Sequence, residues 1–158
     1  MSRSLRWSVR VALVALLFGS VLAQVLVPVL ASATGDLYPE VEHLVVPYSI
    51  VGVLVIACVQ AALLATWRLV SLVRDHAIFA RGAMRWVDLI TACGALAVAL
   101  SAGVMLHLLA IVGLGGPGVV IALVACLSFG MGFLLVMRVL RGLLATAIAD
   151  REELDEVI

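Results

Sequence analysis

This sequence has few charged residues. Charged residues make up 13% of its 158 positions, and hydrophobic residues make up 65%. A soluble protein is about 45–50% apolar, so the composition excludes an ordinary soluble domain. The length allows one domain. We therefore expect an integral membrane protein with a single domain.

The sequence also lacks the residue patterns of common enzymes. Its three cysteines, Cys58, Cys93 and Cys126, form no Cys-x-x-C pair and no cluster with histidine or carboxylate, as a redox or metal site would require. Phosphate-binding glycine loops and nucleophile-elbow motifs are absent. We expect no catalytic residue, no metal and no cofactor, and we interpret the thiols as small buried hydrophobic groups.

Four long runs without charge predict transmembrane helices. Each is long enough to cross a hydrocarbon core of about 30 Å, and each is continuous rather than alternating, which favours a helix over a barrel strand. The expected fold is an all-α bundle of four transmembrane helices followed by an amphipathic C-terminal extension. Its parts are one domain over residues 1–158, helices at about 8–32, 44–70, 85–113 and 117–138, and a tail at 139–158.

The basic residues, all arginine, lie on one side of this predicted topology. The first connecting loop is acidic and the third, "GLGGPG", carries no charge. Because cytoplasmic segments collect the positive residues, we expect both termini and the central loop to face the cytoplasm. The arginines are Arg3, Arg6, Arg10, Arg68, Arg74, Arg81, Arg85, Arg138, Arg141 and Arg151.

The N-terminus allows a second interpretation. Arginines, an apolar run and the sequence Ala31-Ser32-Ala33 resemble a cleavable signal peptide. The apolar run, about 21 residues, is longer than the 7–15 residues of a signal core. We favour an uncleaved first helix, with cleavage as the alternative.

Polar residues inside the predicted spans are few, and such residues are costly in lipid. Gln24 and Gln60 are expected to form a hydrogen bond between helices, and His107 to face water near the outer end of the third helix. No aspartate or glutamate lies within a span, which argues against proton-coupled transport. Asp88 lies at the inner edge, where we expect it to pair with Arg85, one helical turn away.

The tail and the central loop are the strongest candidates for a functional surface. The tail has apolar residues at spacings of three and four, but its end is acidic, and acidic residues oppose the dipole at a helix C-terminus. We expect it to need either solvent or a partner, and the arginine loop is the obvious partner within the chain. One interpretation of that loop is topogenic, with its arginines held at anionic headgroups, and the other is a docking surface for the acidic tail or for a cytoplasmic protein. The predicted docking residues are Arg74, Arg81, Arg85, Glu152, Glu153, Asp155 and Glu156.

Small residues recur at every fourth position of the last helix, at Gly118, Ala122, Cys126 and Gly130. Such stripes allow close approach of helices within one chain or between copies. The alternative to a docking protein is therefore a homo-oligomeric transporter or channel subunit that assembles through this face. A structural component of a larger membrane complex is a third interpretation.

The layout is similar to that of a bacterial membrane family called domain of unknown function 2975. The shared part of the central region is Phe79, Arg85 and the apolar residues Val87, Leu89 and Ile90, whereas Ala80 and Ala83 replace the family's hydroxyl and Asn. The resemblance brings no established activity that could be transferred to this chain. It implies a small helix-turn-helix regulator as a partner, and we expect no direct contact of this chain with nucleic acid.

Overall fold

The computed structural model of the chain is helical over the residues that it describes, except at Gly113 and Gly116. These are residues 3–37, 42–74, 81–113 and 116–156, with side chains described over 7–33, 43–71, 82–113 and 116–149. The prediction of four long apolar helices is confirmed, because each of the four is long and apolar enough to cross a membrane. The elements are α1 (Arg3–Leu37), α2 (Glu42–Arg74), α3 (Arg81–His107), a π-helical turn η2 (Leu108–Val112) and α4 (Pro117–Glu156).

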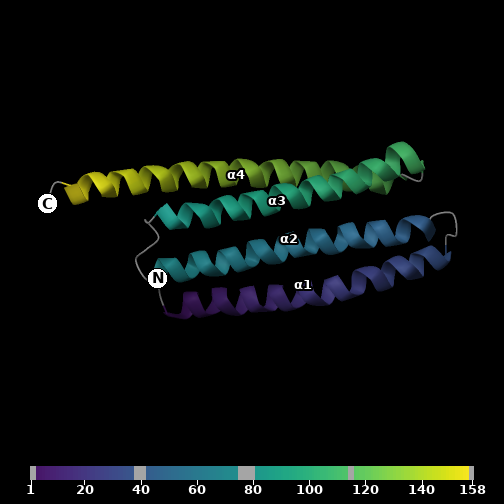
Figure 1. The fold of residues 1–158 in the computed structure, drawn as a ribbon, viewed down its shortest axis with the longest axis horizontal. Coiled ribbons are helices and arrows are strands. Elements are labelled where there is room, and N and C mark those ends of the chain that lie inside the picture. Colours follow the sequence, from purple (N-terminus) through teal and green to yellow (C-terminus); the bar gives the residue numbers. More distant parts are fainter. Residues whose placement is uncertain (1–2, 38–41, 75–80, 114–115, 157–158) are drawn as a thin grey trace.

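The last helix is much longer than a membrane crossing requires. α4 has 40 residues, which is about 60 Å at roughly 1.5 Å per residue, or about twice the hydrocarbon thickness. It starts at Pro117, where a missing backbone N–H costs no helical hydrogen bond. Its C-terminal part extends past the ends of the other three helices (Figure 1). The segment that the sequence predicts as a tail is therefore a continuation of α4.

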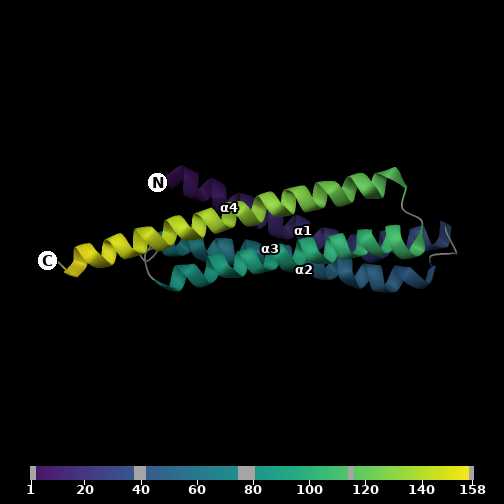
Figure 2. The same ribbon diagram turned by 90° about the horizontal axis from the view of Figure 1, so that it is seen from above.

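The helices lie in an open row in the order of the chain. α1 contacts α2, α2 contacts α3, and α3 with η2 contacts α4, whereas α1 and α4 make no contact within the described residues. Figure 1 shows α1 and α4 at opposite edges of the row, and Figure 2 shows that they cross in projection, so the row is twisted. The structure is thus more open than the bundle that we expected. Lipid chains are as apolar as leucine, so no hydrophobic force closes such a bundle.

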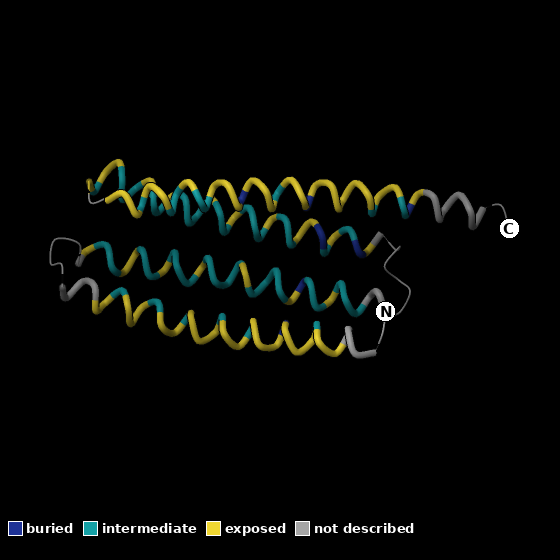
Figure 3. The backbone as a smooth tube through the Cα atoms, turned by 180° about the vertical axis from the view of Figure 1, so that it is seen from behind, coloured by how far each residue is buried: buried dark blue, intermediate teal, exposed yellow. Residues whose placement is uncertain are grey.

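Few side chains of the helices are buried within the chain. Most residues of α1 and α4 are exposed, and residues of α2 and α3 are mostly of intermediate exposure (Figure 3). The exposed side chains include large apolar ones on every helix, such as Phe18, Leu54, Leu96 and Phe129. A bilayer would cover these side chains, so the fold is that of a multi-pass membrane protein. The buried residues of the described part are Leu13, Ala65, Ala83, Val87, Gly130, Met137 and Ile148.

Candidate functional site

Glycines allow α3 and α4 to approach each other closely. A Cβ atom on Gly130 of α4 would lie 2.6 Å from a methyl group of Val98 in α3. Conversely, a Cβ atom on Gly94 of α3 would collide with the ring of Phe133 in α4. Each helix therefore receives a side chain of the other where it has none of its own. This reciprocal fit fixes the antiparallel register of α3 and α4.

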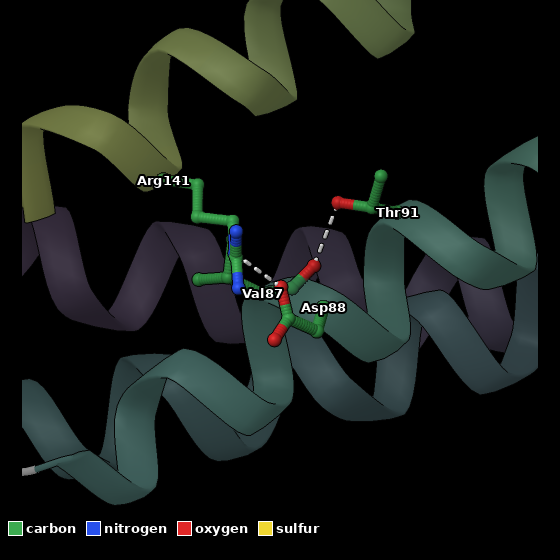
Figure 4. Close-up of polar contacts among 4 residues, drawn as sticks. All are labelled: Val87, Asp88, Thr91 and Arg141. Carbon is green, nitrogen blue, oxygen red and sulfur yellow. Dashed lines mark hydrogen bonds and ion pairs between the residues drawn. The ribbon is translucent and has the colours of Figure 1, made fainter. Parts of the chain in front are cut away.

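That register brings together an ion pair at one end of the hairpin. Nε of Arg141 in α4 lies 2.6 Å from Oδ1 of Asp88 in α3, and both side chains are about half exposed (Figure 4). One turn further along α3, the hydroxyl of Thr91 donates a hydrogen bond of 2.8 Å to the carbonyl oxygen of Val87. The expectation that Asp88 pairs with Arg85 is wrong. A neighbour within the same helix was favoured by spacing, but packing of α4 against α3 supplies a closer one.

The ion pair belongs to a wider basic region, which we call the arginine-rich end. α1 begins there, α2 ends, α3 begins and α4 continues outward (Figure 1). Arginine side chains on all four helices are exposed at this end. Among the described side chains they are Arg10, Arg68, Arg85, Arg138 and Arg141.

Two cavities flank the contact of α3 with α4. The first, of about 500 Å³, is almost wholly apolar and is lined by α2, α3 and α4. Cys58, Cys93 and Cys126 all line it, so three cysteines distant in sequence share one apolar surface. The second, of about 460 Å³, lies between α3 and α4 and includes Asp88 and Arg138 in its lining. We call these the cysteine cavity and the Asp88–Arg138 cavity.

The two glutamines expected in the membrane do join helices. Nε2 of Gln60 in α2 donates a hydrogen bond of 3.0 Å to Oε1 of Gln24 in α1. Near it, a Cβ atom on Gly52 of α2 would lie 3.0 Å from Val27 of α1. The predicted hydrogen bond is confirmed, and its place in the α1–α2 contact gives it a structural role.

His107 has a partner that the sequence did not indicate. Its Nδ1 lies 2.7 Å from the hydroxyl of Tyr48 in α2, with the two rings edge to face. The histidine is partly exposed, but it joins α2 to α3 rather than simply facing water. The π-helical turn η2 follows directly and ends at Gly113, whose φ of 68° suits a residue without Cβ.

Of the seven predicted docking residues, one has a described side chain. Arg85 is exposed in the second turn of α3. Arg74 and Arg81 lie at the ends of their helices, and Glu152, Glu153, Asp155 and Glu156 lie in the last turns of α4. The side chains of these six are outside the described part of the chain, so their contacts remain predictions.

The described part of the extension packs along a narrower stripe than the sequence predicts. Ile148 is buried, and Leu144 and Ala147 are partly shielded. Leu140 and Leu143 are exposed. Because α4 contacts only α3 and η2 among the helices, the shielded stripe follows the α3–α4 contact beyond Arg141.

The small-residue stripe of α4 is used within the chain for part of its length. Gly130 is buried against Val98, and Cys126 lines the cysteine cavity. Gly118 has open space around it. An oligomer through the whole stripe would have to displace α3, so this face is a poor candidate for assembly between copies.

Two arginines of α4 acquire roles that sequence reasoning missed. Arg138 and Arg141 look like ordinary topogenic charges, because nothing in the sequence reports which face of α3 they meet. A spacing of three places both on one side of α4, and this spacing was the signal in the sequence that they face the same neighbour.

Fold and composition define the class: a four-helix integral membrane protein with charge concentrated at one end.

Comparison with known proteins then places the chain in a family. The family described as "Protein of unknown function (DUF2975)" matches residues 29–158, so the chain belongs to it. The match covers α2, α3 and α4 in full and only the last part of α1. No curated protein matches the chain, and no solved structure matches it.

Proposed function

We propose that this chain is a non-enzymatic protein of the bacterial inner membrane that docks a soluble protein at its arginine-rich end. In this proposal both termini and the connection between α2 and α3 face the cytoplasm. The partner is a small helix-turn-helix regulator, the class implied by the family resemblance. Holding such a regulator at the membrane would withdraw it from its DNA.

One observation carries the proposal: α4 continues without a break past the ends of the other three helices. The helix from Pro117 to Arg138 is about 32 Å long, close to one hydrocarbon thickness. From Arg138 to Glu156 it runs about 27 Å further. A helix of this kind presents a fixed surface to a soluble partner, and the Asp88–Arg141 ion pair fastens its base to α3.

The distribution of charge also favours docking at the arginine-rich end. Exposed arginines gather there, and the last turns of α4 carry four of the acidic residues predicted to dock. Adjacent surfaces of opposite sign suit a partner with both signs of charge, because such complementarity selects orientation and speeds association.

Photo-cross-linking in living cells tests the proposal. A photoreactive amino acid replaces Ala149, an exposed residue of α4 beyond the ion pair, or Ile111, an exposed residue at the opposite end. We expect an adduct with a soluble protein from position 149 and none from position 111. Mass spectrometry of the adduct identifies the partner, and a DNA-binding protein supports the regulator in particular.

A matched pair of charge variants separates docking from general electrostatics. In the chain with the photoreactive residue at 149, Arg81 and Arg85 are changed to Gln together, or Arg6 and Arg10 are. Both variants lose the same charge at the same end. The adduct should disappear in the first and persist in the second. Equal yields in both variants, or no adduct in the unsubstituted arginine background, would contradict docking through the central arginines.

A further inference from the structure

The Asp88–Arg138 cavity has the composition of a site for an amphiphile. Its apolar lining comes from both helices and its charged residues lie at one end of it. The lining residues are Asp88, Thr91, Ala92 and Ala95 of α3 and Met131, Leu134, Leu135 and Arg138 of α4. Its volume of about 460 Å³ is within the range of roughly 300–1,000 Å³ that is usual for ligand sites.

The cavity runs along the helices, from the membrane interior to its surface. On α3 its lining extends from Ala95 to Asp88, and on α4 from Met131 to Arg138. Each stretch is about two turns, or roughly 10 Å. Since Arg138 lies about one hydrocarbon thickness from Pro117, the charged end is at headgroup level and the apolar end is among the acyl chains.

The charged end favours an anion. The carboxylate of Asp88 is already paired with Arg141, and the two arginines together outnumber the single acid. Among the described residues, Arg138 has no ion-pair partner in the chain. A guanidinium presents several N–H donors in a planar array that matches phosphate oxygens.

We propose that this cavity binds one anionic phospholipid. Its phosphate contacts the guanidinium of Arg138, and an acyl chain lies against Ala92, Ala95 and Leu135. Met131 and Leu135 are exposed, so the cavity opens to the surface that lipid covers and needs no separate entrance. The site goes beyond the proposed docking function and would exist whether or not a soluble protein binds the same end.

Another groove at the arginine-rich end also combines apolar residues with an arginine, but it is not enclosed by two helices. It is lined by Trp7, Arg10, Val11, Val14, Ala15 and Phe18. All of these belong to α1, so no second helix encloses a bound chain. We expect lipid to contact this groove as it contacts any arginine at an interface, at about 1 kcal/mol for each arginine, without selecting one molecule.

The test is native mass spectrometry of the purified full chain, released from nanodiscs of phosphatidylglycerol, of phosphatidylcholine or of an equal mixture. We expect one phosphatidylglycerol molecule to be retained in preference to phosphatidylcholine. Arg138→Gln should lower the ratio of retained phosphatidylglycerol to phosphatidylcholine by roughly fivefold, which is the loss of about one arginine–headgroup contact. Arg68→Gln removes the same charge from an exposed position of α2 outside the cavity and should leave the ratio unchanged.

A second pair of variants tests the apolar part without changing charge. Ala95→Phe fills the cavity and should release the retained lipid, whereas Ala99→Phe adds the same ring one turn away, on an exposed position outside the lining. Circular dichroism confirms that each variant is helical before it is compared.

Four results would overturn the proposal. Equal loss in Arg138→Gln and Arg68→Gln would mean unspecific attraction, and equal retention of both lipids would mean an apolar groove without headgroup selection. Displacement of the lipid by inorganic phosphate would mean a site for a soluble anion. A dimer that excludes lipid from the cavity would mean that a second copy occupies it.

Discussion

The two hairpins of this protein use different means to hold antiparallel helices together. α1 and α2 meet through a hydrogen bond between Gln24 and Gln60, within the two apolar spans. α3 and α4 meet through shape, because Gly94 and Gly130 each admit a side chain of the other helix. In lipid, both are reasonable substitutes for the hydrophobic effect, which does not drive helices together there.

The difference matters for what each hairpin can do. The amide pair and the approach of Val27 to Gly52 join α1 to α2, and most of the other described residues of α1 are exposed. Close packing at two glycines fixes the register along α3 and α4, and the register in turn aligns Asp88 with Arg141 and shapes the Asp88–Arg138 cavity. We therefore place the working part of the molecule in the α3–α4 hairpin.

The largest expected effect comes from filling the contact at Gly130. Gly130→Ala places a Cβ atom 2.6 Å from a methyl group of Val98, and Val98 has little χ1 freedom on a helix. We expect a loss of about 1–3 kcal/mol, the usual cost of overpacking, in the free energy of unfolding measured by titration with SDS. Gly132→Ala is the matched control, because nothing lies within 4 Å of its Cβ position.

A compensating change sharpens that prediction. Val98→Ala in the Gly130→Ala chain removes the methyl groups that cause the collision and should recover part of the loss. If Gly130→Ala and Gly132→Ala cost the same, the reciprocal fit of α3 and α4 would be contradicted.

A smaller effect is expected at the other hairpin. Gln60→Leu removes the donor to Gln24, and hydrogen bonds between membrane helices contribute about 0.6 kcal/mol on average, with a maximum of about 1.7. A double-mutant cycle with Gln24→Leu, read by the same SDS titration, should give a coupling in this range. A coupling as large as the effect of Gly130→Ala would remove the distinction between the hairpins.

The smallest expected effect is at the ion pair. Asp88 and Arg141 are about half exposed, so their coupling in a cycle of Asp88→Asn and Arg141→Gln should be about 0.2–1 kcal/mol. It should fall as salt increases, because exposed charges are screened. The same cycle with Arg85→Gln is the control and should give no coupling. Coupling of Asp88 to Arg85 rather than to Arg141 would contradict the Asp88–Arg141 ion pair and support the pair that spacing predicts.

The sequence is sufficient to predict what the bilayer dictates. Four apolar runs predicted the helices, because backbone hydrogen bonds in lipid permit little else. The Gln24–Gln60 bond was predictable for a similar reason, since two amides within the apolar spans of neighbouring helices have few other partners. The arginine-rich end follows from the positions of the arginines alone.

What sequence could not predict depends on register and on helix order in space. The partner of Asp88 is decided by how Gly94 and Gly130 set α4 against α3, not by spacing within α3. The partner of His107 is a tyrosine 59 residues away. The open row of helices was also missed, because small-residue stripes report close approach but not how many neighbours each helix has.

The central claim is that the arginine-rich end works from the cytoplasmic side, and cysteine labelling tests it directly. Cys58, Cys93 and Cys126 are first changed to Ala, and a single cysteine then replaces Gly142 or Gly116. Both glycines are exposed with open space around them; Gly116 directly precedes α4, and Gly142 follows Arg141 at the arginine-rich end. An impermeant maleimide should label position 116 in cells with an opened outer membrane, and position 142 only after the inner membrane is permeabilised. Labelling of position 142 before permeabilisation, with position 116 protected, would contradict the account.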